Sequence, residues 1–316
     1  MSSSEAIDQG RFDRRPLTAA KGFLRAHIKE LLVGYPLAML LVFFVLPSAY
    51  LVVVSFFPKP AGEFYSVGFT LANYGQLLES PIYLDYLLKT LEFAGITAVL
   101  STAMGYPVAY WIARVDSELK RQVYLLTIIA SMWLTVIIRA YAIKVVFAGN
   151  GLFNQALQAG GVIEEPITGG NGYLTVVLGM LYGFLPFAIL TMYTSVKNID
   201  PELEQASRNL GASKLRTIRE VTLPLSRNGI VASAALVFIL SIGSYAVPML
   251  LGNPSEWTLP VIITNTVRDQ LNVPFGSVLA IVMTLLIVVL FWASVRYLGL
   301  GSEQLVGDAP EEEADG

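Results

Sequence analysis

The chain has 316 residues, of which 54% are hydrophobic and only 14% are charged, and its formal net charge at pH 7 is −3. Soluble domains carry about a quarter of charged residues, so this composition indicates a membrane protein. The sequence has no cysteine and a single histidine, His27. It therefore excludes disulfides, cysteine nucleophiles and histidine-based metal sites, and we expect no metal, no cofactor and no nucleic-acid partner for this chain.

Six apolar stretches are long enough to cross a hydrocarbon core of about 30 Å as helices. The third is the least regular, because Arg139 and Lys144 interrupt its second half. We predict an all-α polytopic membrane protein with six transmembrane helices. The expected spans are residues 33–57, 91–114, 123–147, 173–196, 230–251 and 276–299.

Lysine and arginine are distributed unequally between the two sides of these spans. Most of the 21 basic residues lie on one side, and only Lys59, Lys89 and Arg268 lie in the segments on the other side. Positively charged segments stay in the cytoplasm, so both termini and the segment 197–229 are predicted to be cytoplasmic. The chain divides into a basic N-terminal tail 1–32, a transmembrane domain 33–299 and an acidic C-terminal tail 300–316.

The segment between the fourth and fifth spans begins with an amphipathic helix. Asp200 can cap a helix whose first residue is Pro201, a residue favoured at that position. Leu203, Ala206 and Leu210 follow at spacings of a helical repeat and form one apolar face. The pattern predicts a short helix that presents an apolar stripe.

A second short helix follows it. Gly211 suits the end of the first helix, Ser213 can cap the second, and the second ends near Pro224. Its own apolar stripe consists of Leu215, Ile218 and Val221. A helix–glycine–helix hairpin between two spans is suited to docking on a partner; an amphipathic hairpin on the membrane surface is the alternative.

This hairpin resembles the EAA coupling loop of ABC-importer permeases, whose pattern is Glu-Ala-Ala, three residues, Gly, nine residues, Ile, one residue, Leu-Pro. The spacing from glycine to proline matches throughout. The lead glutamate is replaced by Gln205, and Glu204 stands one residue early, so contact with the motor is expected to rely on Glu204, or on Arg208 and the apolar face. The resemblance gives as coupling residues Glu204, Gln205, Ala206, Ser207, Arg208, Gly211, Val221, Leu223 and Pro224.

Three motifs at the ends of spans resemble those of the spermidine/putrescine-type permeases, over about residues 30–300. They are Gly105 to Tyr110, Arg139 to Tyr141 and Ser241 to Gly252. The resemblance implies the type I ABC-importer permease fold, a second homologous permease subunit, an ATP-binding-cassette ATPase dimer and an extracytoplasmic solute-binding protein. The sequence lacks the P-loop pattern, so ATP and Mg²⁺ would bind to the partner ATPase.

Several polar residues within the spans are candidates for the translocation path. Charges within a membrane face a cavity, find a partner or reach the interface. Glu92 could attract a cation or pair with Lys89, and Arg139 could form a structural ion pair or line the path. Pro107 and Pro248 are hinge candidates or static kinks. The path candidates are Glu92, Arg139, Tyr141, Tyr182, Ser244 and Tyr245, of which the tyrosines could instead serve in packing.

The substrate is less defined than the class of transporter. Spermidine or putrescine is favoured by the resemblance, but polyamine-type relatives often carry an acidic residue where this chain has Ser244. A related organic solute therefore stays open. Two other classes remain as alternatives: an ion-coupled secondary transporter, for which the chain offers few titratable groups at mid-membrane, and a membrane scaffold that does not transport.

Overall fold

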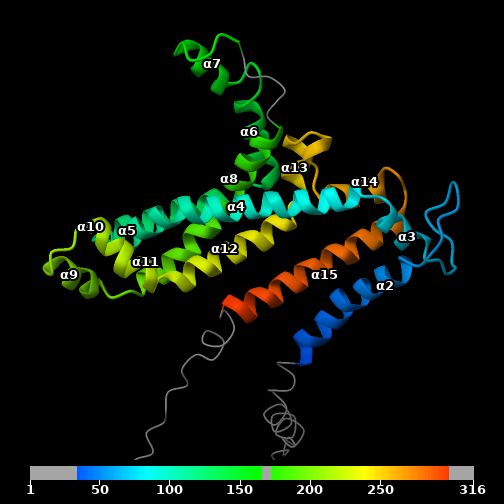
Figure 1. Cartoon of the computed structure of the whole chain (residues 1–316), viewed down its shortest axis with the longest axis horizontal. Coiled ribbons are helices and arrows are strands. Elements are labelled where there is room, and N and C mark those ends of the chain that lie inside the picture. Colours follow the sequence, from blue (N-terminus) through cyan, green and yellow to red (C-terminus); the bar gives the residue numbers. More distant parts are fainter. Residues whose placement is uncertain (1–33, 166–171, 299–316) are drawn as a thin grey trace, which may run out of the picture. The chain divides into compact units, whose positions relative to one another are not determined.

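The computed structural model describes residues 34–165 and 172–298, and every regular element in these two stretches is a helix (Figure 1). The predicted tails 1–32 and 300–316 lie outside the described residues. The helices are η1 Leu41–Val45, α2 Leu46–Val54, α3 Ala72–Glu79, α4 Ile82–Ala113, α5 Glu118–Met132, α6 Val136–Val146, α7 Leu152–Ala159, α8 Gly172–Lys197, α9 Pro201–Asn209, α10 Lys214–Thr217, η2 Ile218–Thr222, α11 Leu223–Leu225, α12 Arg227–Ile242, α13 Ala246–Leu251, η3 Pro254–Glu256, α14 Leu259–Arg268 and α15 Val273–Leu298.

The first span is a helix over Gly34–Val54 that belongs to a separate compact unit. Its middle part, η1, is a π-helical turn, in which the hydrogen bonds reach one residue further than in an α-helix. Its apolar side chains are almost all exposed, as Phe43 is at 72%. A helix that is apolar on all sides suits a lipid environment.

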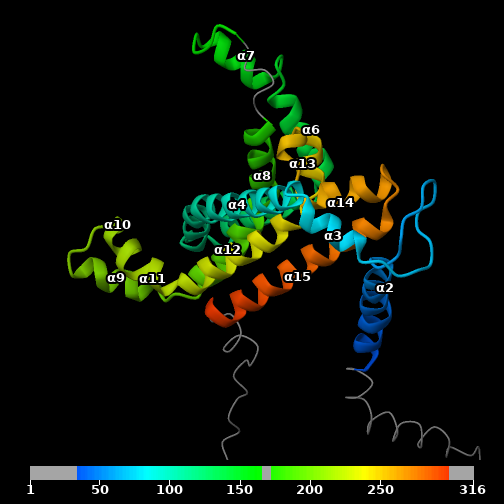
Figure 2. The ribbon, with the colours of Figure 1, turned by 45° about the vertical axis from the view of Figure 1, so that its right-hand side comes forward.

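The second unit, from Ser55 onward, is built around α4, α8 and α12, which pack against one another (Figures 1 and 2). Small buried residues such as Ala109 and Ala188 line their contacts, and Met192 fills the space between them. Small side chains let helices approach closely in a membrane. At the closest approach, a Cβ added to Gly229 would lie 2.2 Å from the side chain of Ser195, so only glycine fits there.

Within the described residues, four helices are long and apolar enough to cross a membrane, and up to six spans result if each of two bent helix pairs is counted as one. The predicted spans 173–196 and 276–299 agree with α8 and α15 to within three residues. The second span is longer than predicted, because α4 begins at Ile82, directly after Pro81. Its polar first turns had been assigned to the outer segment.

The third predicted span, 123–147, is a bent pair of helices and not one continuous helix. Helices α5 and α6 meet at an angle of 89°. The chain leaves the helical conformation before Thr135, whose hydroxyl accepts a hydrogen bond from the N–H of Ile138 and so caps α6. At 1.5 Å per residue, the 15 residues of α5 extend roughly 22 Å, too short to cross alone.

The fifth predicted span, 230–251, is also interrupted. Helix α12 ends at Ile242, and α13 begins at Ala246 after a break of three residues. Pro248 is the third residue of α13, where the backbone N–H has no helical partner in any case. The helix therefore restarts before the proline. A further bend, of 69°, separates α12 from the helical segment Lys214–Leu225 that precedes it.

Candidate functional site

The hairpin between α8 and α12 begins with α9, and the predicted caps are present. The carboxylate of Asp200 accepts a hydrogen bond from the N–H of Glu202 at 2.9 Å, and Pro201 is the first helical residue. In the second helix, the hydroxyl of Ser213 accepts from the N–H of Arg216 at 3.3 Å. These caps satisfy N–H groups that each helix start leaves unpaired.

The turn between the two helices depends on Gly211, whose φ is +89°. The N–H of Gly211 binds the carbonyl of Arg208 at 2.9 Å, and the N–H of Ala212 binds that of Ser207 at 3.2 Å, the hydrogen-bond pattern of a Schellman motif. The hydroxyl of Ser207 also lies 3.2 Å from that of Thr217 and ties α9 to the second helix. The hairpin is therefore fixed in shape by its own bonds.

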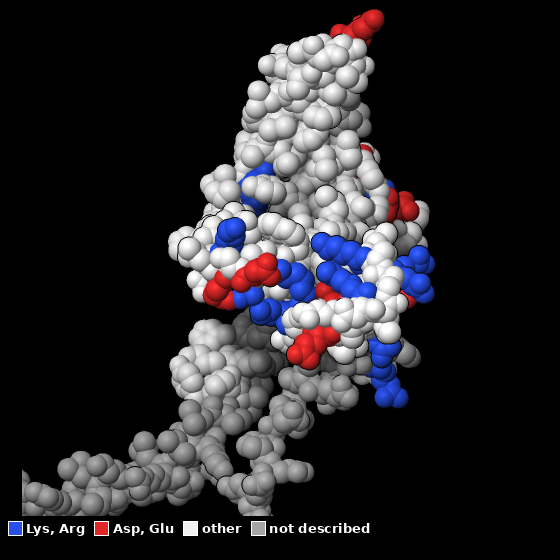
Figure 3. All heavy atoms as spheres, turned by 90° about the vertical axis from the view of Figure 1, so that its left-hand side faces the viewer, with Lys and Arg blue, Asp and Glu red and all other residues white. Residues whose placement is uncertain are grey.

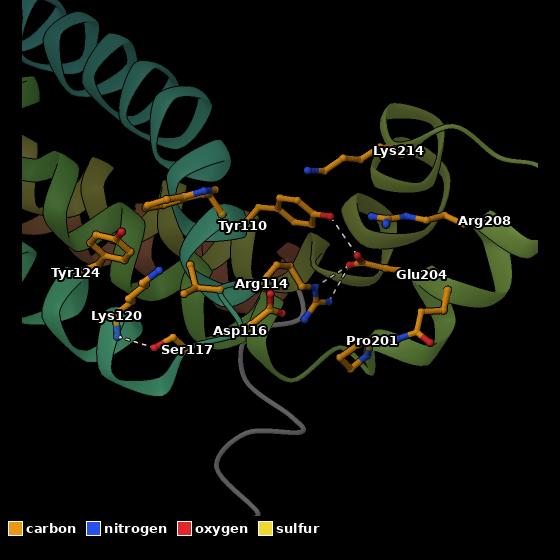
Figure 4. A pocket seen from close by; sticks show the side chains of 13 residues that line it. Tyr110, Arg114, Asp116, Ser117, Lys120, Tyr124, Pro201, Glu204, Arg208 and Lys214 are labelled. Atoms are coloured by element: carbon orange, nitrogen blue, oxygen red, sulfur yellow. Dashed lines mark hydrogen bonds and ion pairs between the residues drawn. The ribbon is translucent and has the colours of Figure 1, made fainter.

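Glu204 fastens the hairpin to the end of α4 (Figure 4). The Nη2 and Nε atoms of Arg114 donate to Oε1 of Glu204 at 2.8 and 3.0 Å, and the hydroxyl of Thr222 donates to the same oxygen at 3.0 Å. The hydroxyl of Tyr110 donates to Oε2 at 3.1 Å. Glu204 is only 5% exposed, so its carboxylate is fully used inside the protein.

Arg114 makes a second contact that completes this junction. Its Nη2 atom also donates to the carbonyl of Ile199 at 3.2 Å, just before α9 begins. One guanidinium thus joins the end of α4 to both the entry and the first helix of the hairpin. Such multidentate pairing is what arginine, unlike lysine, provides.

The pKa of Glu204 reflects this environment. Burial by itself raises the pKa of this carboxyl group, because it disfavours the charged form. The hydrogen bonds from Arg114 and Thr222 outweigh burial and hold the pKa below its ordinary value. Glu204 is therefore ionised at neutral pH and remains paired with Arg114.

The opposite face of the hairpin is apolar and uncovered. Leu203 is 48% exposed, Leu210 is 90% exposed and Leu215 is 76% exposed, and Ala206 beside them is also exposed. Leucines on an uncovered stripe are typical of an interaction surface. The remaining predicted coupling residues lie around it: Gln205, Arg208, Leu223 and Pro224 are exposed, and Val221 is half-buried.

Arg139, a predicted path residue, is buried at the bend between α5 and α6. Its Nη2 atom donates to the carbonyl of Ser131 at 2.6 Å, and its Nη1 atom donates to that of Gly183 at 3.1 Å. The guanidinium carbon also lies 5.7 Å from the ring centre of Tyr182. Among the described residues Arg139 has no ion-pair partner, so it binds carbonyl oxygens where the helices bend instead of forming an ion pair.

Glu92, the other charged path candidate, pairs with Lys89. The Nζ atom of Lys89 lies 2.9 Å from one carboxylate oxygen of Glu92, and the hydroxyl of Tyr173 donates to the other at 2.7 Å. Lys89 also lies over the rings of Phe93 and Tyr173. The predicted pair is thus present, and it connects α4 to the start of α8.

A protein-family model described as "Binding-protein-dependent transport system inner membrane component" matches residues 30–300. The chain belongs to this family. It is therefore a membrane permease component of an ABC importer and not an enzyme. The match covers all of the described helices, including the hairpin.

Known relatives agree with this assignment. The permease is 32% identical over 266 residues to the spermidine/putrescine transport system permease protein PotB of Escherichia coli (strain K12), covering 82% of this chain and 94% of that protein. It is 31% identical over 257 residues to PotB of Haemophilus influenzae, covering 81% and 89%. It is 33% identical over 245 residues to the inner membrane ABC transporter permease protein YdcU of Escherichia coli (strain K12), covering 73% and 76%.

Solved structures show the same fold. The crystal structure of a bacterial ABC transporter involved in the import of the acidic polysaccharide alginate has a chain with a TM-score of 0.69, 16% identity, and coverage of 90% of this permease and 100% of that chain. The alginate transporter in complex with an alginate pentasaccharide-bound periplasmic protein gives a TM-score of 0.71 at 15% identity, covering 87% and 94%. The predicted type I ABC-importer permease fold is thereby confirmed.

The other candidates for the translocation path and for hinges lie in different parts of the permease and not in one cluster. Tyr141 is exposed on α6, and Ser244 and Tyr245 form the break between α12 and α13. Pro107 lies inside α4, which continues past it to Ala113. Of the path candidates, the described contacts join only Arg139 and Tyr182 directly.

Sequence reasoning missed the inner partners of Glu204. Arg114, Tyr110 and Thr222 were not predicted as site residues, although Arg114 is the last residue of the predicted second span. The signal in the sequence was weak, since 90 residues separate Arg114 from Glu204. The expectation that Glu204 would contact the motor is not supported, because its carboxylate is enclosed by this permease itself.

Proposed function

We propose that this permease forms half of a pore that imports a small polar solute, together with a second homologous permease subunit. A separate ATP-binding-cassette ATPase dimer supplies the energy, and an extracytoplasmic solute-binding protein delivers the solute. The hairpin, residues 197–229, and the tails 1–32 and 300–316 lie on the cytoplasmic side of the membrane. The unequal distribution of lysine and arginine supports this orientation.

The observation that carries the proposal is the contrast between the two faces of the hairpin. Its inner face is tied to α4 by Glu204 and Arg114, and its outer face presents Leu210 and Leu215. A docked ATPase would cover these leucines, and closure of the ATP-bound dimer would push on a hairpin that the Glu204–Arg114 pair holds against α4. The movement then passes to the helices around the translocation path. It shifts the permease between two discrete conformations.

The substrate class that the relatives support is a polyamine, spermidine or putrescine, because relatives of that printed description align with most of the chain. Ser244 stands where polyamine-type relatives often carry an acidic residue, and a probable molybdenum ABC transporter permease of Haloferax volcanii is 30% identical over 168 residues. A solute other than a polyamine is therefore the second candidate within the same class of transporter.

Reconstitution tests this proposal. Vesicles are prepared with the permease, its partner permease and ATPase, and its solute-binding protein, and spermidine uptake is measured with ATP or with an ion gradient alone. We expect uptake that requires ATP and the solute-binding protein. A second set of vesicles holds this chain alone, and uptake driven there by an ion gradient would favour the secondary transporter instead. Binding of labelled solutes to the isolated binding protein identifies the cargo separately.

A further inference from the structure

A pocket of about 630 Å³ lies between the hairpin and the end of α4. The end of α4 and the start of α5 form one wall, and α9 and α10 form the other. Figure 4 shows Arg208 and Lys214 extending from the hairpin toward α4, while Lys120 lies on the opposite wall. The pocket therefore brings cations from two separate parts of the chain to one place.

The pocket has an excess of positive charge. Arg114 and Glu204 neutralise each other, and Asp116 is the remaining acidic residue of the lining. In the part of the chain that the structure describes, Lys120, Arg208 and Lys214 form no ion pair. Three cations thus face a single free carboxylate.

Two neighbouring cations differ from those in the pocket. Arg121 is paired with Glu118 on α5, and Arg216 is paired with Glu220 at 3.0 Å on the hairpin. Basic side chains are prominent on this end of the protein (Figure 3). Arg121 and Arg216 are thus neutralised within the chain, whereas Lys120, Arg208 and Lys214 have no ion-pair partner among the described residues.

Aromatic rings beside the pocket indicate its depth relative to the membrane. Trp111 and Tyr124, which both line it, have ring centres 4.6 Å apart, and Trp111 is 54% exposed. Exposed tryptophan and tyrosine are enriched where lipid headgroups begin. Basic pockets between helices at the cytoplasmic interface suit anionic headgroups.

We propose that this pocket binds a phosphate group, donated by the headgroup of an anionic phospholipid or by a soluble phosphate. The proposal rests on the cytoplasmic orientation given above. Lys120 and Lys214 would contact the phosphate from opposite walls, and Arg208 can offer a planar, multidentate contact. The bound phosphate bridges α5 and the hairpin, and so strengthens the junction that Glu204 and Arg114 form.

Lipid binding to the complete transporter tests the proposal. The complex is placed in vesicles of phosphatidylcholine with a graded content of phosphatidylglycerol, extracted with its lipids, and the retained phosphatidylglycerol is counted by native mass spectrometry. We compare the wild type with Lys120→Gln and Lys214→Gln. Each substitution should weaken binding about fivefold, the effect expected for one cation near an anionic surface.

Arg219→Gln is the matched control, because Arg219 is a cation of the same hairpin that does not line the pocket. This variant should retain phosphatidylglycerol like the wild type. Thermal unfolding of each variant identifies any that fails to fold, and the remaining lysine variant then carries the test. Equal losses in the control and in the pocket variants would overturn the proposal, since they would reflect surface charge alone.

Two further arms identify the source of the phosphate. Inorganic phosphate is added to complexes in phosphatidylcholine, and protection of Lys120 and Lys214 from amine labelling is measured. Protection by phosphate but not by phosphatidylglycerol supports a soluble ligand at the same site. Protection by the ATPase alone, with neither phosphate source present, would overturn the proposal in favour of an acidic side chain of that partner. ATP-dependent uptake in phosphatidylcholine is recorded in parallel, so failure of this site remains distinguishable from failure of the coupling function.

Discussion

The two faces of the hairpin differ in how far the permease itself covers them. The inner face holds a carboxylate that is 5% exposed and bonded to three side chains, whereas the outer face leaves Leu210 90% exposed. A surface that only lay on lipid would not need a buried ion pair to hold its position. Under the proposed function, this difference lets a hairpin that is held on one side transmit force that the ATPase applies to the other.

The largest expected effect comes from the inner face. Glu204→Ala leaves Arg114 without its partner in a mostly buried place, which costs about 3 kcal/mol. We expect the hairpin to detach from α4 and ATP-dependent uptake to fall at least tenfold, while the spans still insert. Uptake and protease sensitivity of the hairpin are the measurements. Glu202→Ala is the control, because it removes an exposed carboxylate from the same helix. If the hairpin of both variants were as resistant to protease as that of the wild type, the role given to Glu204 would be contradicted.

The outer face should respond differently. Leu210→Asp changes a side chain that contacts little within the permease, so the stability of the protein should change by no more than about 0.5 kcal/mol. Binding of the ATPase should weaken about thirtyfold, as for a central residue of an interface. Co-purification of the ATPase measures this, and Leu210→Met serves as the apolar control. Undiminished binding to the Asp variant would show that the stripe is not the docking surface.

The turn links the two faces and is expected to be less sensitive. At Gly211, φ is +89° and a Cβ would meet no atom within 4 Å, so the effect of substitution is conformational and not a clash. Gly211→Val should destabilise the turn by about 1–2 kcal/mol, and Gly211→Asn should be better tolerated because asparagine visits this region. Uptake by the two variants gives the comparison, and equal uptake would mean that the turn geometry is unimportant.

The smallest expected effect is a change in the stability of the protein in acidic solution. The pKa of Glu204 is lowered in the folded protein, so its contribution to stability is present above the unfolded value, about 4.3, and is lost as the pH falls through the folded pKa. The difference in stability between the wild type and Glu204→Gln should be constant above about pH 5 and shrink in more acidic solution. Thermal unfolding at several pH values measures it. A difference that grew in acid would contradict the assignment.

Local signals made the hairpin predictable from the sequence. Asp200, Ser213 and Gly211 act on backbone atoms within a few residues of themselves, so their types and spacing are enough to identify two caps and a turn. The number of apolar stretches was equally visible, because the length that crosses a membrane is fixed by the rise of a helix.

Long-range features could not be predicted in the same way. The bond between Arg114 and Glu204 depends on how α4 packs beside the hairpin, and a single sequence contains no signal for that pairing. The bend before Thr135 was missed because apolar residues continue across it without a proline or glycine. A hydropathy profile reports the length and composition of an apolar stretch, and it does not distinguish a straight helix from a bent pair of helices.

Cross-linking tests the central claim, that the outer face of the hairpin meets the ATPase, most directly. The chain has no cysteine, so Leu210→Cys and Gln158→Cys each create a single attachment site for a photoactivated cross-linker. Gln158 is exposed on α7, in a segment proposed to lie on the opposite side of the membrane. We predict a product with the ATPase from position 210 and none from position 158. An intact, ATP-dependent complex that yields the product from 158, or from neither position, would contradict the account.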